Sequence, residues 1–128
     1  MVDVEVFAGR PEHPRISYFT GSSTDPAVIA QIDEAIVGER TLIILDSDHR
    51  RDHVLRELRA WHSRVSVGSY VIVEDSNING HPVSSSWGPG PMEAVDAFLE
   101  ENDDFVVDES MHKFFMTFNP RGYLKRVK

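Results

Sequence analysis

Two short apolar segments of this 128-residue chain each run directly into a cluster of acidic residues. Residues 42–45 (Leu-Ile-Ile-Leu) lead into residues 46–49 (Asp-Ser-Asp-His), and residues 70–73 (Tyr-Val-Ile-Val) lead into residues 74–75 (Glu-Asp). A short, continuous apolar run is typical of a strand buried on both faces, as in a parallel sheet covered by helices. Because ligands of open α/β sheets bind at the carboxyl ends of the strands, we expect these acids to line a site.

The acids that follow the two strands, Asp46, Glu74 and Asp75, are suited to a divalent cation such as Mg²⁺. Carboxylate oxygens are hard ligands, and a cation relieves the repulsion between like charges that lie close together. The alternative is that such acids only cap the next helix, and Asp48 is the candidate for that role. We favour the metal site, with His49 beside it as a general base, because imidazole titrates near neutral pH.

Strand and helix patterns alternate along the rest of the chain. Asp25 and Pro26 are a favourable N-cap and first helical residue, and residues 77–90 are too rich in Gly, Pro and Ser for regular structure. Two strands without a helix between them close the chain, which indicates an α/β sandwich whose mostly parallel sheet has an antiparallel edge. We expect strands at residues 2–7, 16–19, 41–45, 70–73, 105–107, 114–118 and 123–124, and helices that start at Pro26, near His49 and at Pro91.

Composition excludes several classes of function. The formal net charge is −8, from 21 acidic residues against 13 Lys and Arg, and such a surface repels the phosphate backbone of nucleic acids. There is no cysteine, so the chain has neither a disulfide framework nor a thiolate metal site. No apolar stretch has the length of a membrane span and no signal peptide is visible. We expect one cytoplasmic domain over residues 1–128.

Three further features have both a functional and a structural interpretation. Residues 21–24 (Gly-Ser-Ser-Thr) offer hydroxyl and amide groups to a polar ligand, or form only a turn and cap, and they match neither the Walker A nor the GxGxxG pattern. His49 and His53 have the spacing of a zinc pair on a helix, as in a zinc hydrolase, but no HExxH pattern is present. Trp87 either covers a substrate or packs within its loop.

Five segments in order along the chain form a recognisable pattern. They are residues 21–26, 45–49, 68–75, 88–91 and 119–126. Together they resemble the cephalosporin hydroxylase family, and the resemblance covers nearly the whole chain, starting at about Val2. That family has the fold of class I S-adenosylmethionine (SAM)-dependent methyltransferases and includes rhamnosyl O-methyltransferases. The resemblance implies a three-layer Rossmann-like sandwich and a SAM- and Mg²⁺-dependent methyl transfer to a hydroxyl of a sugar or other small molecule.

The resemblance also implies roles for particular residues. Asp46, Glu74 and Asp75 match the metal ligands of catechol-type O-methyltransferases, and His49 stands where those relatives carry a lysine base. In the family a serine-bearing loop lies near the SAM adenine, and an acid at the end of the second strand holds the ribose. The residues that match this SAM site are Gly21, Ser22, Ser23 and Thr24 for the loop, and Asp3 or Glu5 for the acid.

One part of the family's pattern is absent from the sequence. The fold's first strand and its glycine-rich loop, which cradles the methionine part of SAM, have no counterpart, so the chain resembles the fold from its second strand onward. The missing strand is central, and its loss leaves two apolar strand edges without a partner. We therefore expect a C-terminal portion of the fold that forms a homo-oligomer. The alternative to an enzyme is a non-catalytic binding or assembly module.

Overall fold

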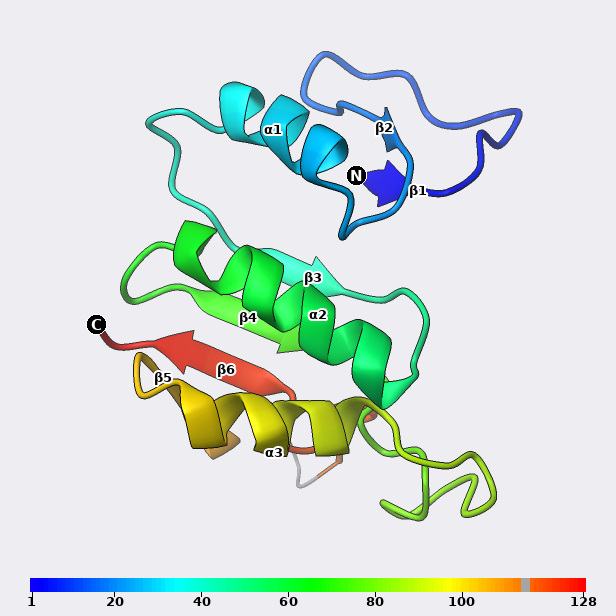
Figure 1. Cartoon of the computed structure of the whole chain (residues 1–128), viewed down its shortest axis with the longest axis vertical. Coiled ribbons are helices and arrows are strands. Elements are labelled where there is room, and N and C mark those ends of the chain that lie inside the picture. Colours follow the sequence, from blue (N-terminus) through cyan, green and yellow to red (C-terminus); the bar gives the residue numbers. More distant parts are fainter. Residues whose placement is uncertain (114–115) are drawn as a thin grey trace. The chain divides into compact units, whose positions relative to one another are not determined.

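The computed structural model describes residues 1–113 and 116–128 of the chain. These residues form two compact units, Met1–Glu39 and Arg40–Lys128. Both units contain strands and a helix or helices, so the predicted mixed α/β class is confirmed (Figure 1). The expectation that residues 1–128 make one domain stays a prediction.

The first unit is built on two very short strands. β1 (Val2–Asp3) pairs in parallel with β2 (Phe19–Thr20), with Val2 opposite Phe19. The first strand, predicted at residues 2–7, is therefore shorter than expected. The second, predicted at residues 16–19, begins only at Phe19. The alternating apolar side chains after Asp3 do not enter a core: Val4 and Val6 are exposed, and the half-exposed Phe7 ring contacts the Arg10 guanidinium.

Helix α1 (Pro26–Ala35) begins where the sequence predicts. Asp25 is its N-cap, and its carboxylate accepts a hydrogen bond from the N–H of Ala27 at 2.8 Å. This bond satisfies one of the donors that a helix start leaves without a partner. Val28 is the buried residue of α1.

The second unit contains a four-stranded sheet. Its strands are β3 (Ile43–Leu45), β4 (Tyr70–Val73), β5 (Phe105–Val107) and β6 (Tyr123–Arg126), in the order β3-β4-β6-β5. β3 and β4 are parallel, whereas β6 is antiparallel to both of its neighbours. The reversed strand thus lies inside the sheet, between β4 and β5 (Figure 1), and not at the edge as predicted.

Two helices, α2 (Arg51–Trp61) and α3 (Pro91–Glu101), cover the same face of this sheet (Figure 1). Two 3-10 turns, η1 (His62–Arg64) and η2 (Glu109–Met111), complete the unit. No helix among the described residues is long and apolar enough to cross a membrane. The core between sheet and helices consists of Leu45, Val54, Leu55, Leu58, Trp61, Val65, Val71, Val73, Ala94, Val95, Phe98, Phe105 and Leu124.

Among the described residues, the opposite face of the four-stranded sheet is only partly covered: His112 packs on Tyr123 of β6, while side chains at the two outer strands stay exposed. Strand side chains alternate, so Leu45 is buried while its neighbour Ile44 is 55% exposed, and Val106 is 46% exposed beside the buried Phe105. The described part of this unit therefore has two layers. The third layer of the expected sandwich, and the missing first strand, stay predictions.

Other expected elements differ from the structure at their ends. The predicted strand 114–118 begins at residues 114–115, outside the described residues, and residues 116–118 do not form a strand. Helix α2 starts at Arg51 with Arg50 as an N-cap that makes no side-chain bond. Asp48 consequently does not cap α2, and His49 precedes the helix instead of lying on it.

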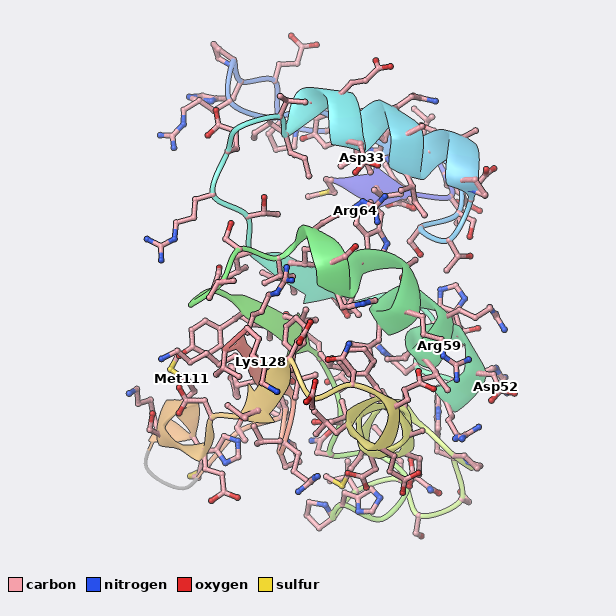
Figure 2. All side chains as sticks on the ribbon, turned by 60° about the vertical axis from the view of Figure 1, so that its left-hand side comes forward. Asp33, Asp52, Arg59, Arg64, Met111 and Lys128 are labelled. Atoms are coloured by element: carbon pink, nitrogen blue, oxygen red, sulfur yellow. The ribbon has the colours of Figure 1, made fainter. Side chains whose placement is uncertain are left out.

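A bidentate ion pair links the two helices of the second unit. Arg59, labelled on α2 in Figure 2, donates from Nε to Oε1 of Glu101 at 2.6 Å and from Nη2 to Oε2 at 2.8 Å. Both side chains are largely exposed, so this pair orients α2 and α3 but adds little stability compared with the apolar core.

Truncating the core should destabilise the chain far more than truncating a surface aromatic. Phe98 is 1% exposed and packs edge-on against Phe105, with ring centroids 5.7 Å apart. We expect Phe98→Ala to lower the free energy of unfolding by about 3–5 kcal/mol in urea titrations. The matched control, Phe118→Ala, removes a ring that is 74% exposed and should change it by less than about 0.5 kcal/mol. Equal losses would contradict this assignment of the core.

Candidate functional site

The parallel pairing of β3 and β4 brings the two predicted acid clusters together. Leu45 pairs with Val73, the last residue of β4, so the strands end at the same level. The ladder continues one step further, because the N–H of Glu74 donates to the carbonyl of Leu45 at 3.0 Å. Asp46 and Glu74 therefore leave the sheet side by side, as the sequence predicts.

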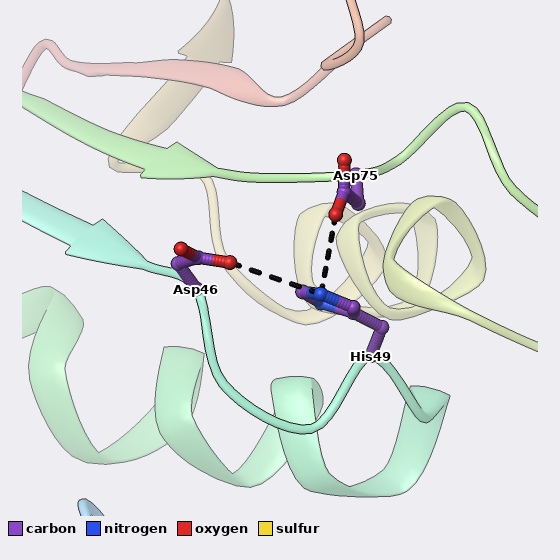
Figure 3. A group of neighbouring side chains, drawn as sticks. All are labelled: Asp46, His49 and Asp75. Atoms are coloured by element: carbon purple, nitrogen blue, oxygen red, sulfur yellow. Dashed lines mark ion pairs between the residues drawn. The ribbon is translucent and has the colours of Figure 1, made fainter. Parts of the chain in front are cut away.

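Asp46, His49 and Asp75 converge on one point (Figure 3). His49 Nε2 lies 3.2 Å from Asp75 Oδ2 and 3.7 Å from Asp46 Oδ1. One ligand atom from each of the three residues lies within 4.8 Å of the others. Asp75 is aimed by its backbone, which is left-handed (φ 51°) and whose N–H donates to Asn119 Oδ1 at 2.9 Å. A conformation that is uncommon for a non-glycine residue thus occurs at the site.

Glu74 is not one of the three converging residues, but their charges shift the pKa of its carboxyl group. Burial raises the pKa of the Glu74 carboxyl, and the carboxylates of Asp46 and Asp75 raise it further, while His49 acts in the opposite direction. The site therefore carries more negative charge than its own side chains neutralise. Such an excess favours either protonation or a bound cation.

Two other residues weighed from the sequence lie elsewhere. The carboxylate of Asp48 is exposed and lies 3.7 Å from Arg50 Nε. His53 directs Nε2 toward Glu57 Oε1 at 3.5 Å, and His49 directs the same atom toward the acids. The two histidines therefore do not converge as a zinc pair would.

The sequence analysis missed Glu57, which anchors the loop between Asp46 and His49. Glu57 lies on α2, is 1% exposed, and accepts a hydrogen bond from Ser47 Oγ at 2.7 Å. A buried carboxylate is costly unless hydrogen bonds compensate it, so this contact fixes the loop to the helix. The available signal was helical periodicity, since position 57 falls three residues after Val54 on the buried face.

A second carboxylate, Glu93 on α3, anchors the long loop of residues 77–90. It accepts hydrogen bonds from the N–H of Gly90 at 2.7 Å, from Asn79 at 2.8 Å and from His81 at 2.8 Å. Although burial opposes ionisation, the bonds from His81, Gly90 and Asn79 lower the pKa of Glu93 to about 2. The loop was predicted, but its anchor was not. The bond from the Gly90 N–H to the glutamate three residues later is one half of a capping box, because glycine has no side chain to make the other half.

The residues predicted to contact SAM lie together in the first unit. The N–H of Gly21, directly after β2, donates to the carbonyl of Asp3 at 2.9 Å. Within residues 21–24, the hydroxyls of Ser22 and Thr24 are 3.0 Å apart. The carboxylate of Asp3 lies 3.5 Å from Arg10 and accepts the N–H of Glu5 at 3.1 Å. The structure thus brings Asp3 beside this loop, and a role in cofactor binding stays a prediction.

Comparison with known proteins identifies the family. The family model for rhamnosyl O-methyltransferase/CmcI matches residues 2–127. The chain belongs to this family. The resemblance stated from the sequence motifs is thereby confirmed, and membership of a methyltransferase family agrees with the mixed α/β fold.

Curated members of the family are closely similar to the chain but longer. Rhamnosyl O-methyltransferases of Mycobacterium tuberculosis and Mycobacterium bovis are 44% identical over 118 residues, which are 88% of this chain and 48% of the relative. The Mycobacterium leprae protein of the same name is 39% identical, over 88% of this chain and 51% of its own length. The chain therefore spans about half the length of these relatives. No solved structure matches it.

Removing the charge of Glu74 should stabilise the metal-free protein at neutral pH. Because its pKa is raised above 4.5, the folded chain holds this proton more tightly than the unfolded chain, and the resulting stability is lost as pH rises through the raised pKa. We expect Glu74→Gln, in EDTA, to raise the melting temperature at pH 7 by roughly 1–4 °C, with the gain shrinking toward pH 4. Glu100→Gln, on the exposed side of α3, serves as the control. A gain that grows toward pH 4 would contradict the prediction.

Proposed function

We propose that this member of the family takes part in transfer of a methyl group from SAM to a sugar hydroxyl. In this proposal Asp46, Glu74 and Asp75 hold Mg²⁺, and His49 is the general base. The observation that carries the proposal is the convergence of Asp46, His49 and Asp75 at the ends of two parallel strands. The names of the relatives, rhamnosyl O-methyltransferases, support the reaction and the sugar acceptor.

The donor set fits a divalent cation. Carboxylate oxygens from two strand ends are the ligands that Mg²⁺ and Mn²⁺ prefer, and the raised pKa of Glu74 indicates negative charge that a cation would neutralise. A metal held by Asp46, Glu74 and Asp75 would orient the acceptor hydroxyl and lower its pKa. Nothing in this arrangement requires a softer, thiolate-type site, and the chain has no cysteine to supply one.

His49 supplies the proton transfer that the reaction needs. SAM, when bound, offers a methyl group on a positively charged sulfur. The cofactor would supply the methyl group to the acceptor oxygen and keep the electron pair of the broken carbon–sulfur bond on its sulfur. His49 Nε2 takes the proton that the hydroxyl loses, and the carboxylate of Asp75, 3.2 Å away, stabilises the imidazolium that forms. Asp75 therefore serves the base in addition to the cation.

The contact with SAM is assigned to the first unit. Gly21, Ser22, Ser23 and Thr24 bring hydroxyl groups to the start of α1, and the backbone of Asp3 lies beside Gly21, with the Asp3 carboxylate next to Arg10. Hydroxyl and carboxylate groups of this kind suit the adenosine part of SAM, which carries ring nitrogens and ribose hydroxyls. Calorimetric titration of SAM into the wild type and Asp3→Asn reports on this part of the proposal separately from the metal.

Removing one metal ligand should weaken cation binding. Asp75→Asn keeps the shape of the side chain but removes its charge, so we expect Mn²⁺ affinity, measured by electron paramagnetic resonance, to fall at least about tenfold. Mg²⁺ should compete with Mn²⁺ on the wild type. Asp103→Asn is the matched control, because Asp103 is exposed and pairs with Lys128 at the other end of the sheet, and the Mn²⁺ affinity of this variant should not change.

The same titration separates two roles of His49, since one nitrogen cannot bind a cation and accept a proton at once. If His49 is the base, His49→Gln keeps the Mn²⁺ affinity of the wild type while methyl transfer is lost. A loss of affinity equal to that of Asp75→Asn would instead make His49 a ligand and contradict its assignment as base. Absence of Mn²⁺ and SAM binding to the wild type would leave the alternative, a non-catalytic module.

We further infer that the chain self-associates. β3 stands at the end of its sheet order, so one of its edges has no strand partner among the described residues. Apolar side chains accompany this edge: Leu42 is 49% exposed and Ile44 is 55% exposed. An apolar edge strand is a template for pairing with a second chain.

A charge beside this edge should weaken association. We expect sedimentation velocity to show concentration-dependent association of the wild type, and Ile44→Lys to weaken it at least about tenfold, because edge charges oppose strand pairing. Val67→Lys, at a position that is 58% exposed in a turn, is the control and should associate like the wild type. A well-folded wild-type monomer at high concentration would contradict the inference.

A further inference from the structure

A hollow of about 450 Å³ lies between the start of α2 and the long loop. Its walls come from two stretches of the second unit, residues 48–56 and residues 87–89. The volume falls within the range of small-molecule pockets, roughly 300–1,000 Å³. Asp48 and Arg50, which line the hollow, flank His49 in the sequence; the His49 ring is directed at the acids and its carbonyl at the loop.

Trp87 forms one wall of this hollow with its ring already fixed. Its Nε1–H donates to the carbonyl of His49 at 3.1 Å, yet the residue is 48% exposed. An aromatic side chain whose polar end is bonded and whose face is open is the usual arrangement at a binding surface. Packing within the loop would instead cover the ring.

The loop that carries Trp87 is held in place without a ligand. Glu93 binds three of its polar groups, and the carbonyl of Pro89 accepts the N–H of Arg51 at 3.0 Å. The N–H of Trp87 itself donates to the carbonyl of Ser84 at 2.9 Å. A ligand would therefore not have to order this wall, which lowers the entropic cost of binding.

The charged groups of the hollow favour a neutral, hydroxyl-rich ligand over an anion. Arg51 Nη1 lies 3.0 Å from the Asp52 carboxylate, and Arg50 Nε lies 3.7 Å from that of Asp48. Two of the three guanidinium groups in the lining thus have a carboxylate beside them, and the third, that of Arg56, lies 3.5 Å from His53 Nδ1. Neighbouring donors and acceptors match a sugar hydroxyl, which both donates and accepts hydrogen bonds.

We propose that this hollow is the carbohydrate subsite of the protein, with the face of Trp87 stacked on the C–H face of a sugar ring and the Arg–Asp pairs bonded to its hydroxyls. The inference deepens the proposed function and depends on it, because it identifies where the methyl acceptor is held. The hollow is linked to the base through the backbone, because Trp87 in its wall donates to the carbonyl of His49.

The test measures binding of methyl α-L-rhamnoside to the full chain by saturation-transfer difference NMR, in a buffer that contains EDTA and no SAM. We expect saturation transfer with the wild type and an affinity about three- to tenfold lower for Trp87→Ala. Trp87→Phe keeps an aromatic face and should retain most of the affinity. Phe118→Ala, which removes an exposed ring outside the hollow, should bind like the wild type.

Further comparisons separate this inference from the metal chemistry. Asp75→Asn should bind the sugar like the wild type, since the assay contains no metal, so failure of the metal site leaves this result unchanged. Arg56→Gln should weaken binding, whereas Arg59→Gln, one turn along α2, should not. No saturation transfer with the wild type, equal affinity in Trp87→Ala, or displacement of the sugar by equimolar inorganic phosphate would overturn the proposal.

Discussion

The parallel contact between β3 and β4 determines where every charged group of the candidate site lies. Leu45 and Val73 pair with each other and are buried under the helices, so the chain leaves the sheet at the same level on both strands. Asp46, Glu74 and Asp75 must then be close, whatever the repulsion between them. The core supplies the free energy that holds these charges together, and the raised pKa of Glu74 is the local cost.

Two glutamates on the helices hold the loops of the candidate site against the core by hydrogen bonds. Glu57 is fully buried on α2 and binds Ser47, and Glu93 on α3 binds Gly90, Asn79 and His81. Both acids lie on helices that pack against the sheet, so the loops move only if these hydrogen bonds break. Because an unpaired buried carboxylate is expensive, the Ser47 contact of Glu57 is costly to break, whereas Glu93 holds its loop through three hydrogen bonds.

The sequence predicted the parts of the structure that depend on neighbouring residues. Two apolar runs that end in acids identified β3 and β4 and the convergence of Asp46 with Asp75, because strand formation and chain direction are local properties. The length of β1 was overestimated. The alternating pattern continues after Asp3, but whether a second strand pairs with these residues depends on the fold and not on the local sequence. The role of Glu57 was not predicted, because its partner Ser47 lies ten residues away in the loop after β3. Tertiary contacts of this kind follow only from the fold.

The start of α2 explains why His49 is available to the site at all. Had Asp48 capped this helix, His49 would be its first residue and would continue the helical backbone. Instead the carbonyl of Pro89 accepts the N–H of Arg51, and the carbonyl of His49 accepts the indole N–H of Trp87. Two hydrogen bonds in opposite directions thus join the loop before α2 to the loop before α3. The helix start is satisfied by a distant loop, which leaves the His49 ring directed at the acids and Asp48 free to line the hollow.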